Sequence, residues 1–105
     1  MSREEIIELI SRRRRQILVH SVIYYKLDEN LISDNTWAEW AKELRQLQSD
    51  YPDLAKECPY ADDFKSFDAS TGYNLPLSDR WAIGKAHQLL RLRDNGIEER
   101  IKKHG

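Results

Sequence analysis

The stretch that decides the fold runs from His20 to Leu54 and reads HSVIYYKLDENLISDNTWAEWAKELRQLQSDYPDL. It contains two segments with apolar residues at helical spacing, separated by the polar turn DENLISD at residues 28–34. The Tyr51-Pro52 step ends the second segment, because a residue before proline avoids helical geometry. The stretch therefore predicts two helices joined by a short turn, which together form a helical hairpin.

The first helix of the hairpin is expected over residues 2–27. Ser2 and Glu5 have the spacing at which a hydroxyl and a carboxylate cap each other's backbone amides. No glycine or proline interrupts the segment, and isoleucines recur along one face. The pattern favours one long helix over a strand.

The second helix is expected to begin at a cap formed by Ser33 or Asp34 and to end at about Ser49. Residues 53–78 have no long periodic pattern, but their aromatic residues predict a segment that is packed against the core. Within it, the Ser-Thr-Gly cluster at 70–72 lacks the Gly-x-x-x-x-Gly-Lys pattern of a phosphate-binding loop and is interpreted as a turn.

A third helix is expected from about Asp79 to Arg93, with Ser78 as its cap and Asn95-Gly96 as its stop. These elements predict an all-α fold in a single domain over residues 1–105. The hairpin would occupy residues 2–54, and the extension 55–105 would add a long ordered loop and the third helix, packed across the hairpin.

Composition excludes several classes of protein. The chain has 105 residues, of which 40% are hydrophobic and 33% are charged. No stretch approaches the roughly 20 apolar residues of a membrane span, and acids and arginines interrupt any signal-peptide pattern at the N-terminus. Cys58 has no disulfide partner, and His87 and His104 have no partners at metal-ligand spacing. We therefore expect a cytoplasmic protein without a metal site or a membrane partner.

Charge is segregated along the chain. Residues 1–27 carry six basic and three acidic groups, residues 28–79 carry four basic and twelve acidic, and residues 80–105 carry seven basic and three acidic. The basic ends can pair with the acidic middle, or they can form a cationic face that meets phosphate. The formal net charge of -1 favours the first interpretation.

In order and spacing, the stretch from His20 to Leu54 resembles the small N-terminal helical domain of NAD-dependent DNA ligases. The resemblance covers about a third of the chain, or about half when the preceding basic helix is included. The motif positions that carry it are Tyr24-Tyr25, Asp28, Ile32-Ser33-Asp34, Trp37-Ala38, Leu44, Leu47 and Tyr51-Pro52-Asp53-Leu54.

The resemblance implies a site for nicotinamide. In that family the domain recognises the nicotinamide mononucleotide half of NAD, with aromatic rings stacked on the nicotinamide and acids on the ribose. The ligand-binding residues carried over from it are Tyr24, Tyr25, Asp34 and Trp37. Trp37 stands where the family has tyrosine, and Ala38 stands where it has aspartate. NAD or nicotinamide mononucleotide is the cofactor implied.

These residues also fit purely structural roles. The three rings have the spacing of core residues between two helices, and Asp34 stands where a helix cap belongs. Four consecutive arginines, Arg12, Arg13, Arg14 and Arg15, are candidate contacts for phosphate or nucleic acid, with Arg12 or Arg13 meeting the phosphate of the mononucleotide. Because helical positions turn by 100° per residue, the four cannot follow one phosphate track, and a solvated surface paired with acids is favoured.

The Lys-x-Asp-Gly nucleophile motif of the ligase catalytic domain is absent from the sequence, and the segment from Lys65 to Asp68 lacks both its spacing and its glycine. We therefore expect no enzyme but a non-catalytic binding module, an accessory protein in nucleic-acid metabolism that acts with an unidentified protein partner. The resemblance suggests a small stand-alone protein of the phage type. Two alternatives stay open: a nucleic-acid-binding protein that uses its basic N- and C-terminal helices, and a protein–protein interaction module.

Overall fold

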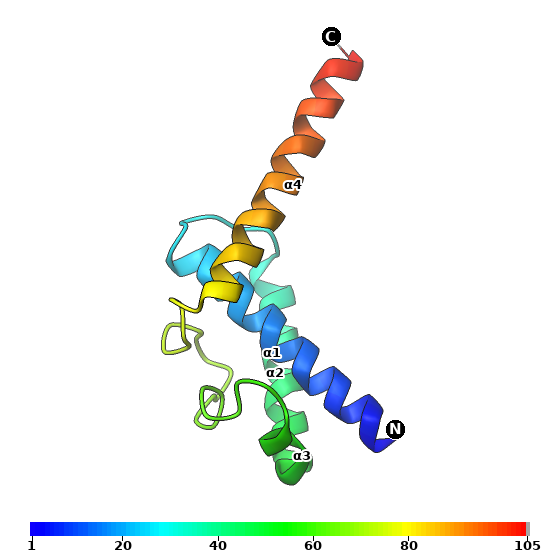
Figure 1. The fold of residues 1–105 in the computed structure, drawn as a ribbon, viewed down its shortest axis with the longest axis vertical. Helices are drawn as coiled ribbons and strands as arrows, with labels where there is room; N and C mark the ends of the chain where they lie inside the picture. Colours follow the sequence, from blue (N-terminus) through cyan, green and yellow to red (C-terminus); the bar gives the residue numbers. More distant parts are fainter. Residues whose placement is uncertain (105) are drawn as a thin grey trace.

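The computed structural model describes the backbone of residues 1–104 and the side chains of residues 1–96. This part of the chain contains four helices and no strands (Figure 1). The helices are α1 (Arg3–Tyr25), α2 (Asp34–Asp50), α3 (Pro52–Glu57) and α4 (Arg80–His104). The prediction of an all-α fold is confirmed. Within the described part, none of the helices has a segment long and apolar enough to cross a membrane.

The hairpin of α1 and α2 forms as the cap residues predict. Ser2 Oγ accepts a hydrogen bond from the Glu5 amide at 3.1 Å, and Ser33 Oγ accepts one from the Thr36 amide at 3.1 Å. The two helices run in roughly opposite directions and pack against each other (Figure 1). Between them, Asp28 adopts a positive φ of 52°, a conformation that aspartate tolerates better than most residues in a tight turn. The hairpin prediction is confirmed.

The core lies where α1 meets all the other helices and the long loop. Its largest fully buried side chains come from α1, from α2 and from the loop, and they are Phe64, Ile10, Ile17, Leu18, Ile23, Leu44 and Val22. Phe64 shows that the loop is packed against the hairpin, as its aromatic composition predicts. Leu75 and Leu77 anchor the same loop further along the chain.

Arg14 is buried in this core and is only 2% exposed. Its Nη1 donates to the carbonyls of Cys58 and Pro59 at 3.2 and 3.0 Å, and its Nε donates to Gln48 Oε1 at 2.9 Å. The guanidinium also lies over the Phe64 ring, 5.8 Å from its centroid. Burial lowers the pKa of Arg14. The prediction of a phosphate contact for Arg14 is wrong, because its donors satisfy the backbone that follows α3.

The chain's only cysteine lies at the end of α3. The Cys58 side chain is 4% exposed, and its Sγ donates to the carbonyl of Leu54 at 3.2 Å and to that of Ile7 at 3.6 Å. The thiol therefore sits between α3 and α1. A buried thiol with two carbonyl acceptors is a packing residue.

Helix α4 crosses α1 through Ala82 and Ala86, which are fully buried. Its cap is Asp79 and not Ser78: Asp79 Oδ2 accepts from the Ala82 amide at 2.9 Å and from the Tyr60 hydroxyl at 3.0 Å. The predicted stop at Asn95-Gly96 is also wrong, since α4 continues to His104. A glycine ends a helix by adopting positive φ, and no described glycine does so. Inside an exposed helix, Gly96 costs only about 1 kcal/mol.

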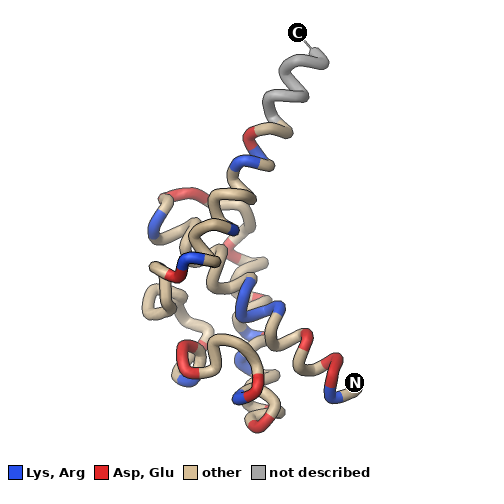
Figure 2. The backbone as a smooth tube through the Cα atoms, viewed as in Figure 1, with Lys and Arg blue, Asp and Glu red and all other residues tan. Residues whose placement is uncertain are grey.

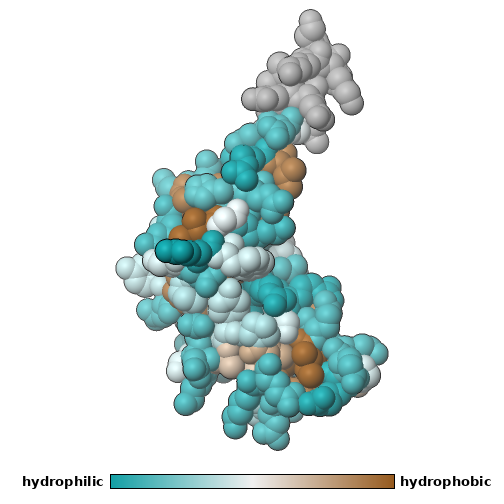
Figure 3. All heavy atoms as spheres, viewed as in Figure 1, coloured by the Kyte–Doolittle hydropathy of each residue, from teal (hydrophilic) through white to brown (hydrophobic). Residues whose placement is uncertain are grey.

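Charge pairing follows the first interpretation of the sequence. Three ion pairs join a basic end of the chain to its acidic middle: Arg3 with Glu57 at 2.7 Å, Arg13 with Glu43 at 3.1 Å, and Arg93 with Glu29 at 3.1 Å. Basic and acidic positions are interspersed across the elements (Figure 2). The surface in this view is mostly hydrophilic, with apolar residues confined to small patches (Figure 3).

Candidate functional site

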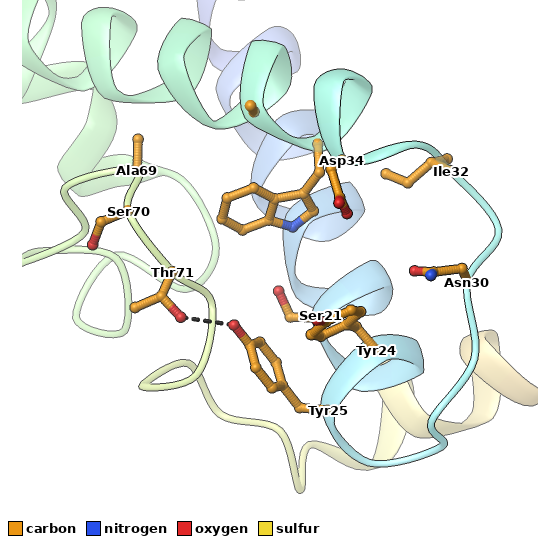
Figure 4. Close-up of a pocket in the computed structure, with 11 residues that line it drawn as sticks. Ser21, Tyr24, Tyr25, Asn30, Ile32, Asp34, Ala69, Ser70 and Thr71 are labelled. Atoms are coloured by element: carbon orange, nitrogen blue, oxygen red, sulfur yellow. Dashed lines mark hydrogen bonds between the residues drawn. The ribbon is translucent and has the colours of Figure 1, made fainter.

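A pocket of about 330 Å3 lies at the end of the hairpin where α1 stops and α2 begins (Figure 4). The long loop of the extension forms the wall opposite α2. The lining residues are Ser21, Tyr24, Tyr25, Asn30, Ile32, Asp34, Trp37, Ala38, Ala69, Ser70 and Thr71. All four residues proposed as ligand-binding from the sequence, Tyr24, Tyr25, Asp34 and Trp37, are therefore brought together in one pocket.

The two tyrosines end α1 and face the pocket from its last turn. Their rings meet edge to face with centroids 4.9 Å apart, and the Tyr25 ring meets Tyr73 of the loop in the same manner at 5.5 Å. Tyr24 is 52% exposed, so it does not belong to the core between the helices. Trp37 is partly buried, and its ring packs edge to face on Phe67 at 6.5 Å. The pocket therefore presents three aromatic rings.

Asp34 is the first residue of α2, and its neighbour Ser33 supplies the cap. The structural interpretation of Asp34 as the cap is therefore wrong. Its exposed carboxylate makes no hydrogen bond or ion pair with the side chains of residues 1–96. It is also the only charged side chain in the pocket lining, which contains no lysine or arginine. The site thus combines three rings with one carboxylate that has no partner among the side chains of residues 1–96, a combination that suits a cationic aromatic ligand.

The loop wall is held against α1 by two close contacts. The hydroxyls of Thr71 and Tyr25 are 2.8 Å apart and share a hydrogen bond (Figure 4). At Gly72, an added Cβ would lie 2.0 Å from Ser21 Oγ and 3.4 Å from Trp37 Cζ2. Only glycine lets the loop backbone approach this closely. Beside this contact, Asp68 Oδ1 accepts bonds from the Ser70 hydroxyl and amide, which lower the pKa of Asp68.

Residues 3–58 match the model of a protein family described as DNA ligase-like, N-terminal NAD+-binding domain. The chain belongs to this family. The resemblance stated from the sequence is confirmed, and the match includes α1, α2 and α3. No curated protein and no solved structure matches the chain. What the family match supports is an NAD+-binding-like module, since it concerns the N-terminal domain and not the catalytic domain of the ligases.

The residues that line the pocket come both from the segment that matches the family, residues 3–58, and from the loop that follows it. Ala69, Ser70 and Thr71 lie outside the matched residues, so the sequence comparison that identified the tyrosines, Asp34 and Trp37 had no counterpart for them. The one signal in the sequence was the Ser-Thr-Gly cluster, which we interpreted as a turn. Its place in the pocket wall depends on contacts with residues about 50 positions away, which no local pattern reveals.

None of the four arginines lines this pocket. Arg13 pairs with Glu43 and lies over the Trp40 ring at 5.6 Å, while Arg14 is buried. At 1.5 Å per residue, Arg13 is roughly 16 Å along α1 from Tyr24. The expectation that Arg12 or Arg13 meets the phosphate of a ligand in this pocket is therefore not met by the geometry. The lining of the pocket contains no lysine or arginine that could pair with a phosphate.

Proposed function

We propose that this protein is a non-catalytic module that binds the nicotinamide end of NAD+ or of nicotinamide mononucleotide. The observation that carries the proposal is the position of the Asp34 carboxylate among three aromatic rings, in the pocket of a chain from an NAD+-binding family. No side chain of residues 1–96 pairs with this carboxylate. The nicotinamide ring of oxidised NAD is a pyridinium cation. Aromatic faces and a carboxylate both attract such a ring, and the attraction grows as water is displaced.

The size and polarity of the pocket support the same assignment. A volume of about 330 Å3 is at the lower end of the range for small-molecule sites and suits a nicotinamide ring with its ribose. Asn30, Ser70 and Thr71 supply polar groups for the sugar hydroxyls. Because the lining has no lysine or arginine, the phosphate would point away from the pocket toward solvent.

We also propose an accessory role in nucleic-acid metabolism, in which ligand-bound protein acts with a protein partner. The support for this role is the ligase-like family together with the absence of the Lys-x-Asp-Gly motif from the sequence. Without that lysine the chain has no counterpart of the ligase nucleophile, so the module would act through binding alone.

The experiment that tests the site compares NAD+ with NADH by isothermal titration calorimetry. The two ligands differ only in the nicotinamide ring, which is a cationic pyridinium in NAD+ and a neutral dihydropyridine in NADH. We expect NAD+ to bind at least about fivefold more tightly than NADH, since a cation–π contact and one nearby carboxylate contribute about 1 kcal/mol or more. Nicotinamide mononucleotide should bind like NAD+, because the adenylate half has no place in the pocket.

Asp34→Asn supplies the matched variant. It should reduce the affinity for NAD+ toward that for NADH, because only the charge of the lining changes. Asp53→Asn is the control, since it also removes a carboxylate from the first turn of a helix but lies away from the pocket. Equal binding of NAD+ and NADH, or no binding of either at millimolar concentration, would show that the pocket does not recognise the nicotinamide cation.

A further inference from the structure

A second hollow, which we call the α1–α4 groove, lies where α4 crosses α1 and has a volume of about 410 Å3. Trp81, Lys85 and Leu89 of α4 line it at one-turn spacing, next to the buried Ala82 and Ala86 that hold the two helices together. The groove shares no lining residue with the pocket that contains Asp34. It therefore needs its own explanation.

The rim of the groove is cationic although the chain as a whole has a formal charge of -1. Arg12, Arg15 and Lys85 line it, against one carboxylate, that of Glu8. Glu8 is paired with Arg12 on the open surface, where Arg12 Nε donates to Glu8 Oε1 at 3.0 Å. Arg12 Nη2 donates to the other oxygen, Oε2, and both side chains are more than half exposed, so the guanidinium keeps further donors that face solvent and can meet a second anion. Arg15 and Lys85 make no ion pair with the side chains of residues 1–96. The run of arginines lies midway along α1 (Figure 2).

The floor of the groove is apolar and aromatic. Val19 and Leu89 supply aliphatic surface, and Trp81 is 47% exposed. No other aromatic ring in the described part of the chain packs on Trp81, so its indole is open to an incoming ring. His20 also lines the groove, and burial lowers the pKa of His20, which keeps its ring neutral near pH 7. An aromatic platform beside three cations is the arrangement with which proteins bind unpaired bases and their phosphates.

We infer that the α1–α4 groove binds single-stranded nucleic acid, with a base stacked on Trp81 and backbone phosphates at Arg12, Arg15 and Lys85. An unpaired strand is favoured over a duplex because stacking on Trp81 requires a base that is free of its partner. It is favoured over an acidic peptide because such a peptide offers charge for the rim but no planar ring for the indole. This binding is independent of the nicotinamide site.

The test is fluorescence anisotropy of a fluorescein-labelled dT12 oligonucleotide with the 105-residue chain. Three phosphate contacts predict that the dissociation constant rises about 20-fold between 50 and 200 mM salt. Arg15→Gln should weaken binding and reduce that salt effect to about sevenfold, because one contact is lost. Trp81→Ala should weaken binding by about fivefold or more at either salt concentration, and Trp81→Phe should restore most of the loss.

Lys56→Gln is the matched control, because it removes one positive charge from exposed surface on α3, away from the groove. It should leave the salt effect unchanged. No rise in anisotropy at 50 mM salt with 0.1 mM protein would overturn the inference, as would unchanged binding by Trp81→Ala. If a dT12·dA12 duplex bound more tightly than single-stranded dT12, the groove would be a site for duplex phosphates, and the inference of an unpaired strand would be wrong. Tighter binding of a twelve-residue polyglutamate peptide would assign the groove to a protein partner.

Discussion

Ala38 is an uncharged residue of the pocket lining, at the position where the resemblance to the ligase domain implies an aspartate. It lies one turn into α2 beside Asp34 and lines the same pocket. Ala38→Asp should therefore raise the affinity for NAD+, because a second carboxylate near a cationic ring adds about 1 kcal/mol, or about fivefold. Titration calorimetry measures the gain. Ala38→Asn has a similar shape without the charge, and an equal gain in that variant would refute the electrostatic explanation.

His20 makes stability depend on pH. Its Nδ1 is buried without a hydrogen-bond partner in the described part of the chain, its ring lies 5.6 Å from that of Trp40, and burial lowers its pKa from 6.5. Below pH 6.5 the unfolded chain binds a proton that the native state excludes. The free energy of unfolding should therefore fall between pH 7.5 and 5.5, by at most about 1.4 kcal/mol per pH unit, until the pH passes the native pKa.

Urea denaturation at the two pH values measures this dependence. His20→Gln should flatten it, since the variant removes the titrating ring. His87 is exposed, so His87→Gln should keep the slope of the natural protein. A slope that survives in His20→Gln would assign the effect to other groups.

At the level of single residues, the sequence predicted the pocket better than it predicted the arginines. The resemblance rested on the order and spacing of Tyr24, Tyr25, Asp34 and Trp37, and the adjoining ends of α1 and α2 bring these residues together. Arg14 could not be distinguished from its neighbours, because four consecutive arginines have no pattern that shows which one faces the core. Its partners, the Gln48 side chain and the carbonyls of Cys58 and Pro59, lie 34 to 45 residues away.

Gly72 in the loop and Gly84 in α4 differ in the space that they leave for a side chain. Gly72 has no room for a Cβ, because the atom would lie 2.9 Å from Ser21 Cβ as well as close to its hydroxyl, whereas Gly84 lies in α4 with nothing within 4 Å. We expect Gly72→Ala to lower the free energy of unfolding by about 1–3 kcal/mol, and Gly84→Ala to raise it by up to about 1 kcal/mol. Chemical denaturation compares the two. If both variants changed the free energy of unfolding by the same amount, the loop at Gly72 would be able to shift and accommodate the added methyl group.

The predicted helix ends were correct where local capping interactions define them, and they were wrong where no local interaction does so. Ser2 and Ser33 cap α1 and α2 as expected, since capping involves residues only three apart. The end of α4 was placed too early because a glycine permits a stop without enforcing one. The course of residues 59–78 depends on anchors such as Phe64 and Leu75 that pack on α1 and α2, and no local pattern specifies such contacts.

The whole molecule is needed to complete both the core and the pocket. The family match ends at residue 58, yet Phe64, Leu75, Ala82 and Ala86 are buried against the hairpin. A chain cut after residue 58 should therefore lack a cooperative thermal transition in circular dichroism and should not bind NAD+, because it exposes the apolar face of α1 and loses the wall at residues 69–71. Residues 1–96 serve as the control. A sharp melt of residues 1–58 would show that the hairpin folds alone.

The buried thiol of Cys58 makes it possible to measure how fast α3 separates from α1. Since it is the chain's only cysteine and is enclosed between Ile7 and Leu54, a disulfide reagent such as dithionitrobenzoate reaches it only when α3 lifts from α1. Under native conditions, the rate at which the reagent releases its coloured product then measures the rate of that opening, and the protein needs no added label. Opening of α3 alone leaves the pocket that contains Asp34, at the other end of the hairpin, in place. If that pocket binds NAD+ as proposed, saturation with NAD+ should slow the colour release only when the whole molecule must unfold for the thiol to react.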